Sequence, residues 1–93
     1  MSSEFESACV KAFTNQCTVD SNYIPWITTH YRAHIIAIGR RLLNNENSWP
    51  FYINPNKDEE FIDFIDGNGF NIKRFSKGTI CKIVPIIHTY EWE

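Results

Sequence analysis

One long helical pattern constrains the fold more than any other feature of the chain. Between Ile24 and Asn44 the apolar residues recur at about 100° per residue. They form one stripe, made of Ile24, Ile27, Tyr31, Ile35, Ile38 and Leu42. A second apolar side carries Trp26, Ala33, Ile36 and Ala37. A helix that is apolar on two sides is usually buried on both. The pattern predicts an uninterrupted central helix over 24–44, with the rest of the chain packed on its two faces.

A second helix is predicted before it, over residues 3–16. Ser3 and Glu6 match a capping box, and the apolar residues that follow recur at helical spacing. We expect this helix to pack on the second side of the central helix, where Ala33 and Ala37 are small enough to let two axes approach. Gly39 lowers the helix propensity by up to ~1 kcal/mol relative to Ala, and close packing would explain its presence.

The second half of the chain alternates strands with one short helix. We predict a strand over 51–53, a helix over 57–66 that begins at Asn56 with Glu59, and strands over 70–75 and 79–87 around a turn at 76–78. Pro85 places the last strand at an edge of the sheet or ends its pairing there, and 88–93 is a tail. The order ααβαββ predicts a single α+β domain over 1–93, with the central helix packed on a small antiparallel sheet.

The end of this order, a helix followed by a two-stranded hairpin, resembles the end of a winged-helix domain. The strand over 51–53, however, stands in the wrong place relative to the first two helices, and the helix over 57–66 is acidic. No family is therefore assigned.

Composition narrows the class of protein. The chain has 93 residues, a net charge of −2 and 43% hydrophobic residues, so a wholly disordered chain is not expected. A dedicated nucleic-acid binder is more often strongly basic. No apolar run approaches the ~18 residues of a membrane span, and the polar, acidic N-terminus is no signal peptide. We expect a cytoplasmic or nuclear protein with three reduced cysteines, Cys9, Cys17 and Cys81.

The residues that could carry chemistry do not form a recognisable motif. His30 and His34 are four apart and could reach one metal ion, but Tyr31 stands where a metalloprotease has Glu. No CxxC supplies further ligands, and no thiol is marked as an activated nucleophile. The Gly67-Asn68-Gly69 stretch follows a helix, whereas phosphate-binding loops precede one. We therefore predict no metal, no cofactor and no enzymatic activity.

Charge is segregated along the sequence, and this suggests two binding hypotheses. Residues 58–66 carry five acids, whereas residues 73–82 carry four cations and no acid. The first hypothesis is a non-enzymatic protein-interaction module, a regulator or inhibitor that occupies a partner protein's surface. Its predicted partner-binding residues are Asp58, Glu59, Asp63, Trp49, Tyr52 and Trp92. The Ile- and Asn-rich composition suits an AT-rich genome, such as that of a virus, a phage or a protist, and a viral or phage-encoded regulator is one form of this hypothesis.

The second hypothesis is a small nucleic-acid-binding domain that uses the basic hairpin and the C-terminal end of the central helix. Its predicted residues are Arg40, Arg41, Lys73, Arg74 and Lys77, with exposed aromatic residues available to stack on bases. A purely structural alternative remains open. Lys73 and Lys82 would then be outward strand positions that protect a sheet edge, and the acids would be an ordinary solvated helix face.

Overall fold

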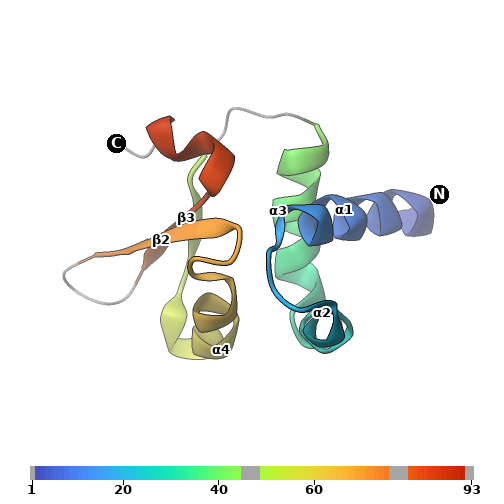
Figure 1. The fold of residues 1–93 in the computed structure, drawn as a ribbon, viewed down its shortest axis with the longest axis horizontal. Helices are drawn as coiled ribbons and strands as arrows, with labels where there is room; N and C mark the ends of the chain where they lie inside the picture. Colours follow the sequence, from blue (N-terminus) through green and yellow to red (C-terminus); the bar gives the residue numbers. More distant parts are fainter. Residues whose placement is uncertain (1, 45–48, 76–79, 92–93) are drawn as a thin grey trace. The chain divides into compact units, whose positions relative to one another are not determined.

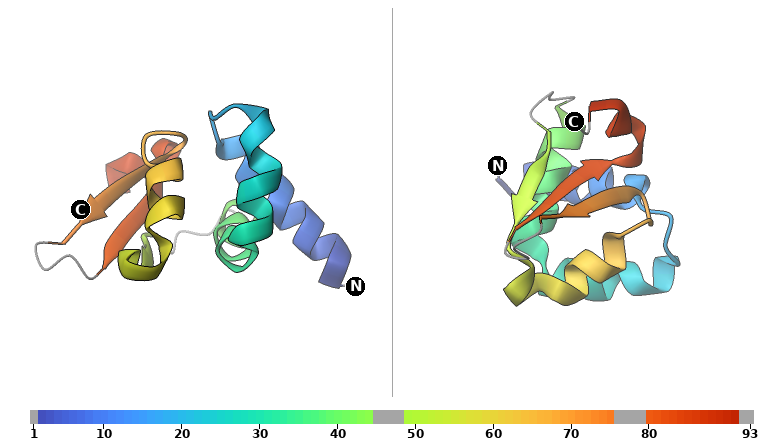
Figure 2. Two further views of the ribbon diagram at one scale, coloured as in Figure 1. Left: turned by 90° about the horizontal axis from the view of Figure 1, so that it is seen from below. Right: turned by 90° about the vertical axis from the view of Figure 1, so that its left-hand side faces the viewer.

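The computed structural model describes residues 2–44, 49–75 and 80–91, and it divides the chain into two compact units. Unit 1 is Met1–Asn47, and its regular elements within residues 2–44 are all helices. Unit 2 is Ser48–Glu93 and contains a three-stranded antiparallel sheet (Figures 1 and 2). The predicted α+β class is confirmed. The predicted single domain and the packing of the central helix on the sheet concern the placement of one unit against the other, so both stay predictions. No helix in the described ranges has the length and apolar character needed to cross a membrane.

In unit 1 the predicted central helix is interrupted. The chain forms α1 (Ser2–Gln16), the short 3-10 helix η1 (Ser21–Tyr23), α2 (Ile24–His30) and α3 (Arg32–Leu43). Tyr31 separates α2 from α3 with φ −127° and ψ 36°. The hydroxyl of Thr29 donates to the carbonyl of Pro25, and Nδ1 of His30 lies 2.9 Å from the carbonyl oxygen of Trp26. Side chains that bond to the preceding turn in this way favour a bend.

The predicted apolar stripe is the core of unit 1. Ile27, Ile35 and Ile38 are fully buried. The other members, Ile24, Tyr31 and Leu42, are half-buried. The second apolar side is only partly buried, because Trp26 is 41% exposed and Ala33 is exposed.

The predicted packing of α1 on α3 is confirmed (Figure 1). The predicted contact through Ala33 and Ala37 is wrong, because Gly39 is the small residue at the crossing and Ala33 is exposed. A Cβ atom at position 39 would overlap the backbone carbonyl of Cys9, so close packing does account for this glycine. Cys9 and Phe13 of α1 are fully buried. The exposed ion pair between Arg32 and Glu6, at 3.2 Å, also joins the two helices.

Unit 2 contains β1 (Phe51–Ile53), α4 (Pro55–Ile65), β2 (Phe70–Arg74), β3 (Cys81–Pro85) and the 3-10 helix η2 (Ile86–Glu91). Helix α4 begins two residues before the predicted start, because Asn54 rather than Asn56 is its N-cap. The Asn54 side-chain oxygen accepts from the Asn56 N–H at 2.9 Å, and Pro55 occupies the first helical position. The backbone is non-helical at Asp58, and Gly67, with φ 77°, follows the end of the helix.

The sheet has the order β1-β3-β2, so the last strand is the central one. Of the two alternatives predicted for Pro85, the position at a sheet edge is therefore wrong, whereas the end of pairing at Pro85 is confirmed, because β3 and its pairing with β2 both end there. Proline is tolerated because the pairing of β3 with β1 ends at Ile83, and Pro85 faces only Phe70 of β2. Residues 86–91 form η2 in place of the end of the predicted strand and most of the predicted tail. The turn predicted at 76–78 lies outside the described residues.

Candidate binding surface

The register divides the side chains of the sheet between two faces. One face holds Ile53, Cys81, Ile83 and Phe70, which are all buried, together with Arg74. Helix α4 lies on this face, because Arg74 contacts side chains of that helix. The opposite face carries the residues between these positions.

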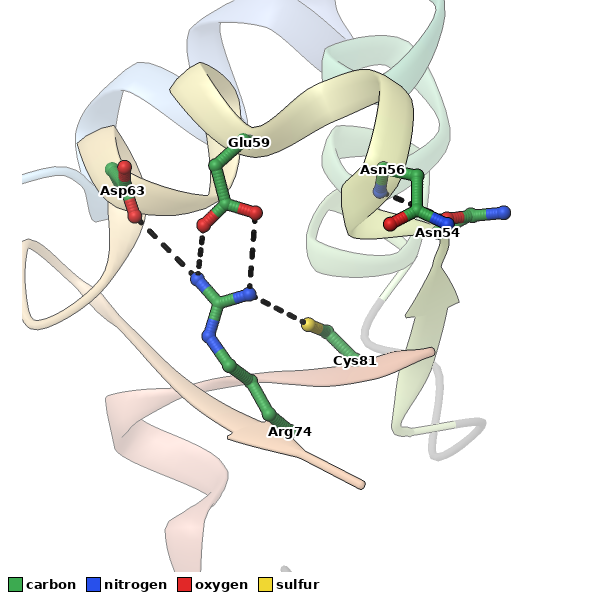
Figure 3. A network of polar contacts seen from close by, with 6 residues as sticks. All are labelled: Asn54, Asn56, Glu59, Asp63, Arg74 and Cys81. Carbon is green, nitrogen blue, oxygen red and sulfur yellow. Dashed lines mark hydrogen bonds and ion pairs between the residues drawn. The ribbon is translucent and has the colours of Figure 1, made fainter. Parts of the chain in front are cut away.

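Arg74 connects the end of β2 to α4 (Figure 3). Its Nη2 donates to Glu59 Oε1 at 2.7 Å and to Asp63 Oδ1 at 3.5 Å, and its Nη1 donates to Glu59 Oε2 at 3.4 Å. Nη1 also lies 3.7 Å from the sulfur of Cys81. The hydrogen bond to Glu59 raises the pKa of Arg74. The side chains remain 40–67% exposed, and pairs this exposed are typically worth ~0–1 kcal/mol.

The contacts of Arg74 alter the interpretation of the acidic and basic segments, which the sequence suggested were separate binding surfaces. Glu59 and Asp63 belong to the predicted protein-binding set, and Arg74 belongs to the predicted nucleic-acid-binding set. In unit 2 these opposite charges contact one another. The acidic and basic segments are therefore not two independent surfaces at this point.

The opposite face of the sheet has an exposed part, which we call the open sheet face. It consists of the exposed residues Tyr52, Lys73, Phe75 and Ile80 and of Lys82, which is half-buried. Tyr52 on β1 and Lys73 on β2 each stand directly opposite Lys82 on β3. The Phe75 N–H donates to the Ile80 carbonyl at 3.2 Å, which continues the pairing one residue beyond Arg74. Val84, further along the same face, is buried, so the open part is the end near the hairpin.

The two lysines of this face form an unusual pair. Like charges directly opposite on neighbouring strands destabilise a sheet, and none of the five positions of the open sheet face is acidic. The Lys82 ammonium lies 5.3 Å from the centre of the Phe75 ring, a contact that offsets part of the repulsion by ~0.5–1 kcal/mol. Protection of a sheet edge does not explain Lys82, because it stands on the central strand.

The apolar members of the open sheet face are more exposed than is usual for their types. Tyr52 is 55% exposed, Ile80 43% and Phe75 39%. Tyr52 and Ile80, with Ile53 and Asn54, line a hollow of about 300 Å³. The face therefore combines two cations and two accessible aromatic rings, and a shallow depression lies at its margin, where Ile53 of the other face also contributes.

The other predicted binding residues lie elsewhere. Trp49 is half-buried and its ring stacks on His88, with ring centres 6.1 Å apart. Asp58 is half-buried at the irregular turn of α4. Arg40 and Arg41 lie in the last turn of α3 in unit 1, where Nη1 of Arg41 donates to the carbonyl of Ala37 at 3.1 Å. Lys77 and Trp92 lie outside the described residues.

The histidines on either side of Tyr31 do not share a continuous helix. The rings of His30 and Trp26 are tilted by 33°, with centres 4.6 Å apart, and His34 stacks on Tyr31 with centres 6.3 Å apart. Within residues 2–44, 49–75 and 80–91, no group of three or more His, Cys, Asp or Glu side chains is placed to hold a metal ion. The predicted absence of a metal and a cofactor stays a prediction.

All three cysteines are free thiols, as the sequence predicts. Burial raises the pKa of Cys9 and of Cys81, and it raises the pKa of Cys17 to about 12. A thiol with a raised pKa is a poor nucleophile at neutral pH. These shifts are opposite to the one that an activated cysteine needs.

Three members of the open sheet face, Phe75, Ile80 and Lys82, are not among the predicted site residues. The signal that could have identified them is the alternation on both sides of the hairpin turn. Lys73 and Phe75 are two apart, as are Ile80 and Lys82, so each pair lies on one face of its strand. Only the register shows that both pairs share the same face.

Comparisons with known proteins return no match: no family model, no curated protein and no solved structure is similar to this chain.

Proposed function

We propose that the protein is a non-enzymatic nucleic-acid-binding module whose contact surface is the open sheet face. Of the two hypotheses drawn from the sequence, this is the one that the geometry supports better. The single observation that carries it is the Lys73–Lys82 pair, which places two cations side by side on a face without acidic positions.

Phosphate groups are the natural partners of such a pair. Lysines that neutralise phosphates release counterions from the nucleic acid, and this supplies most of the sequence-independent affinity. A bound polyanion would remove the repulsion between the two ammonium groups, which the free protein has to tolerate. The predicted acidic protein-binding surface receives less support, because Arg74 already occupies oxygens of Glu59 and Asp63.

A titration of labelled generic RNA and DNA with the full chain tests this function. Lys73→Glu combined with Lys82→Glu should weaken binding at least about tenfold and lower the salt slope by up to about one unit for each phosphate that is no longer neutralised. The matched control is Lys11→Glu combined with Lys57→Glu, two exposed lysines on α1 and α4. The control alters the net charge by the same amount and should change affinity by less than about threefold.

Circular dichroism should show that both double variants keep the wild-type fold, because all four side chains lie outside the core. Equal losses of affinity in the two double variants would mean that only net charge matters, and the proposed surface would be wrong. Failure of the wild-type chain to bind any nucleic acid at low salt would reject the function itself.

A protein-binding role is the second candidate, favoured by the hollow beside Tyr52 and Ile80 at the edge strand β1. A hydrophobic side chain of a partner fits such a depression, and the chain would then act as a regulator or inhibitor. Affinity purification from the native host, with and without nuclease, separates this candidate from the first. A co-purifying protein that survives nuclease treatment but is lost with Tyr52→Lys would support protein binding.

A further inference from the structure

We infer that the ligand of the open sheet face is a single-stranded nucleic acid, with one base stacked on Tyr52, another on Phe75 and the backbone between them bound by Lys82. This inference rests on the proposed function and specifies the class of nucleic acid that the protein binds. Every base has a flat face that can stack on an aromatic ring, so recognition of this kind tolerates many sequences.

The separation of the two rings favours a single strand over a duplex. Tyr52 and Phe75 lie two strands apart and are offset by two residues along the strand direction. With strands ~4.8 Å apart and a rise of ~3.4 Å per residue, their Cα atoms are roughly 12 Å apart. Neighbouring bases of a duplex strand are only about 3.4 Å apart along the helix axis, and each is covered by its neighbours. Bases on these two rings must therefore have left a regular stack.

Lys82 is placed to bind the backbone between these bases. It stands directly opposite Tyr52, and its ammonium lies 5.3 Å from the centre of the Phe75 ring. The ammonium lies over the Phe75 ring, so a base that stacks on this ring face displaces it. The ammonium then moves the short distance to the adjoining phosphate, and Lys73, on the opposite strand position, reaches the next one.

An oligonucleotide with abasic sites isolates the stacking contribution. We would measure binding of a single-stranded thymidine oligonucleotide of about 12 nucleotides, the same oligonucleotide with all central bases removed, and a duplex of equal length. A uridine oligonucleotide serves as the RNA counterpart. The intact and abasic strands carry the same number of phosphates, so their electrostatic attraction is matched. Wild-type protein should bind the intact strand at least about tenfold more tightly than the abasic strand, and more tightly than the duplex.

Variants assign this preference to the two rings. Tyr52→Leu combined with Phe75→Leu should abolish most of the difference between intact and abasic strands, and Tyr52→Phe should keep it. The control is Tyr23→Leu, which removes an exposed tyrosine from η1 in unit 1 and should leave the difference unchanged. Thermal unfolding of each variant checks that the fold is retained.

The outcomes separate this inference from the function on which it rests. If the lysine variants weaken binding but intact, abasic and duplex ligands bind wild type equally, nucleic-acid binding stands and the single-strand inference is overturned. The same conclusion follows if the leucine double variant keeps the full preference for intact strands. If no ligand binds at all, both fail.

Discussion

Cys17 shows how burial of one side chain determines its chemistry. Residues of this type ordinarily titrate near 9.0, and burial raises the pKa of Cys17 to about 12. Between these two pH values the Cys17 thiol therefore stays protonated in the folded chain and is deprotonated in the unfolded chain. The contribution of Cys17 to stability is fully present below pH 9.0 and is lost as pH rises toward about 12.

Cys17→Ala should therefore make the stability less dependent on alkaline pH. Denaturant unfolding from about pH 8 to about pH 10.5 should show a free energy of unfolding that falls less steeply with pH in the variant, by up to one proton. Lysines and tyrosines titrate in the same range in both proteins, so the comparison of slopes removes their contribution. Identical slopes would show that the Cys17 thiol is not protected by the fold.

Gly39 belongs to the scale of elements, because it determines how closely α1 and α3 cross. By helix propensity alone, Gly39→Ala should stabilise α3 by up to ~1 kcal/mol. Because the new methyl group would meet the carbonyl of Cys9, we expect instead a loss of about 1–3 kcal/mol in the free energy of unfolding.

The matched measurement for this prediction is Ala33→Gly, at an exposed position of the same helix. Because Ala33 is the second residue of α3, this change should cost less than the ~1 kcal/mol of a helix interior. It therefore gives a lower limit for the gain that Gly39→Ala would bring without the clash. Greater stability in Gly39→Ala, measured by chemical denaturation, would contradict the close crossing.

Most elements of this fold can be predicted from the sequence, but their ends and interruptions cannot. The buried stripe of Ile27, Ile35 and Ile38 follows from periodicity. The break at Tyr31 does not, because the apolar pattern continues through it. Periodicity does not reveal the hydrogen bond from the Thr29 hydroxyl to the Pro25 carbonyl, which favours a bend. The predicted start of α4 is wrong by two residues, because both Asn54 and Asn56 are residues typical of an N-cap. Asn54 is the N-cap in the structure, and Pro55 then occupies the first helical position, which proline favours.

At the scale of the whole molecule, the candidate site was only partly predictable. The sequence separates acidic from basic residues, but the fold brings Arg74 to Glu59 and Asp63. It also places Lys82 on a central strand, although Pro85 in the same strand suggests an edge. Which charges meet depends on strand order and register, and both arise from contacts between residues far apart in the chain. A net charge of −2 therefore coexists with a local basic face.

Strand order also has a consequence for how the chain is made. The last strand to leave the ribosome, β3, is the one that pairs with both β1 and β2, and β1 and β2 do not pair with each other. During translation β1 and β2 are synthesised before β3. The backbone groups through which they pair with β3 therefore lack these partners until residues 81–85 have been synthesised. A chain cut after residue 80 would lose all these strand pairings at once, and with them the face on which the lysines and aromatic rings are assembled.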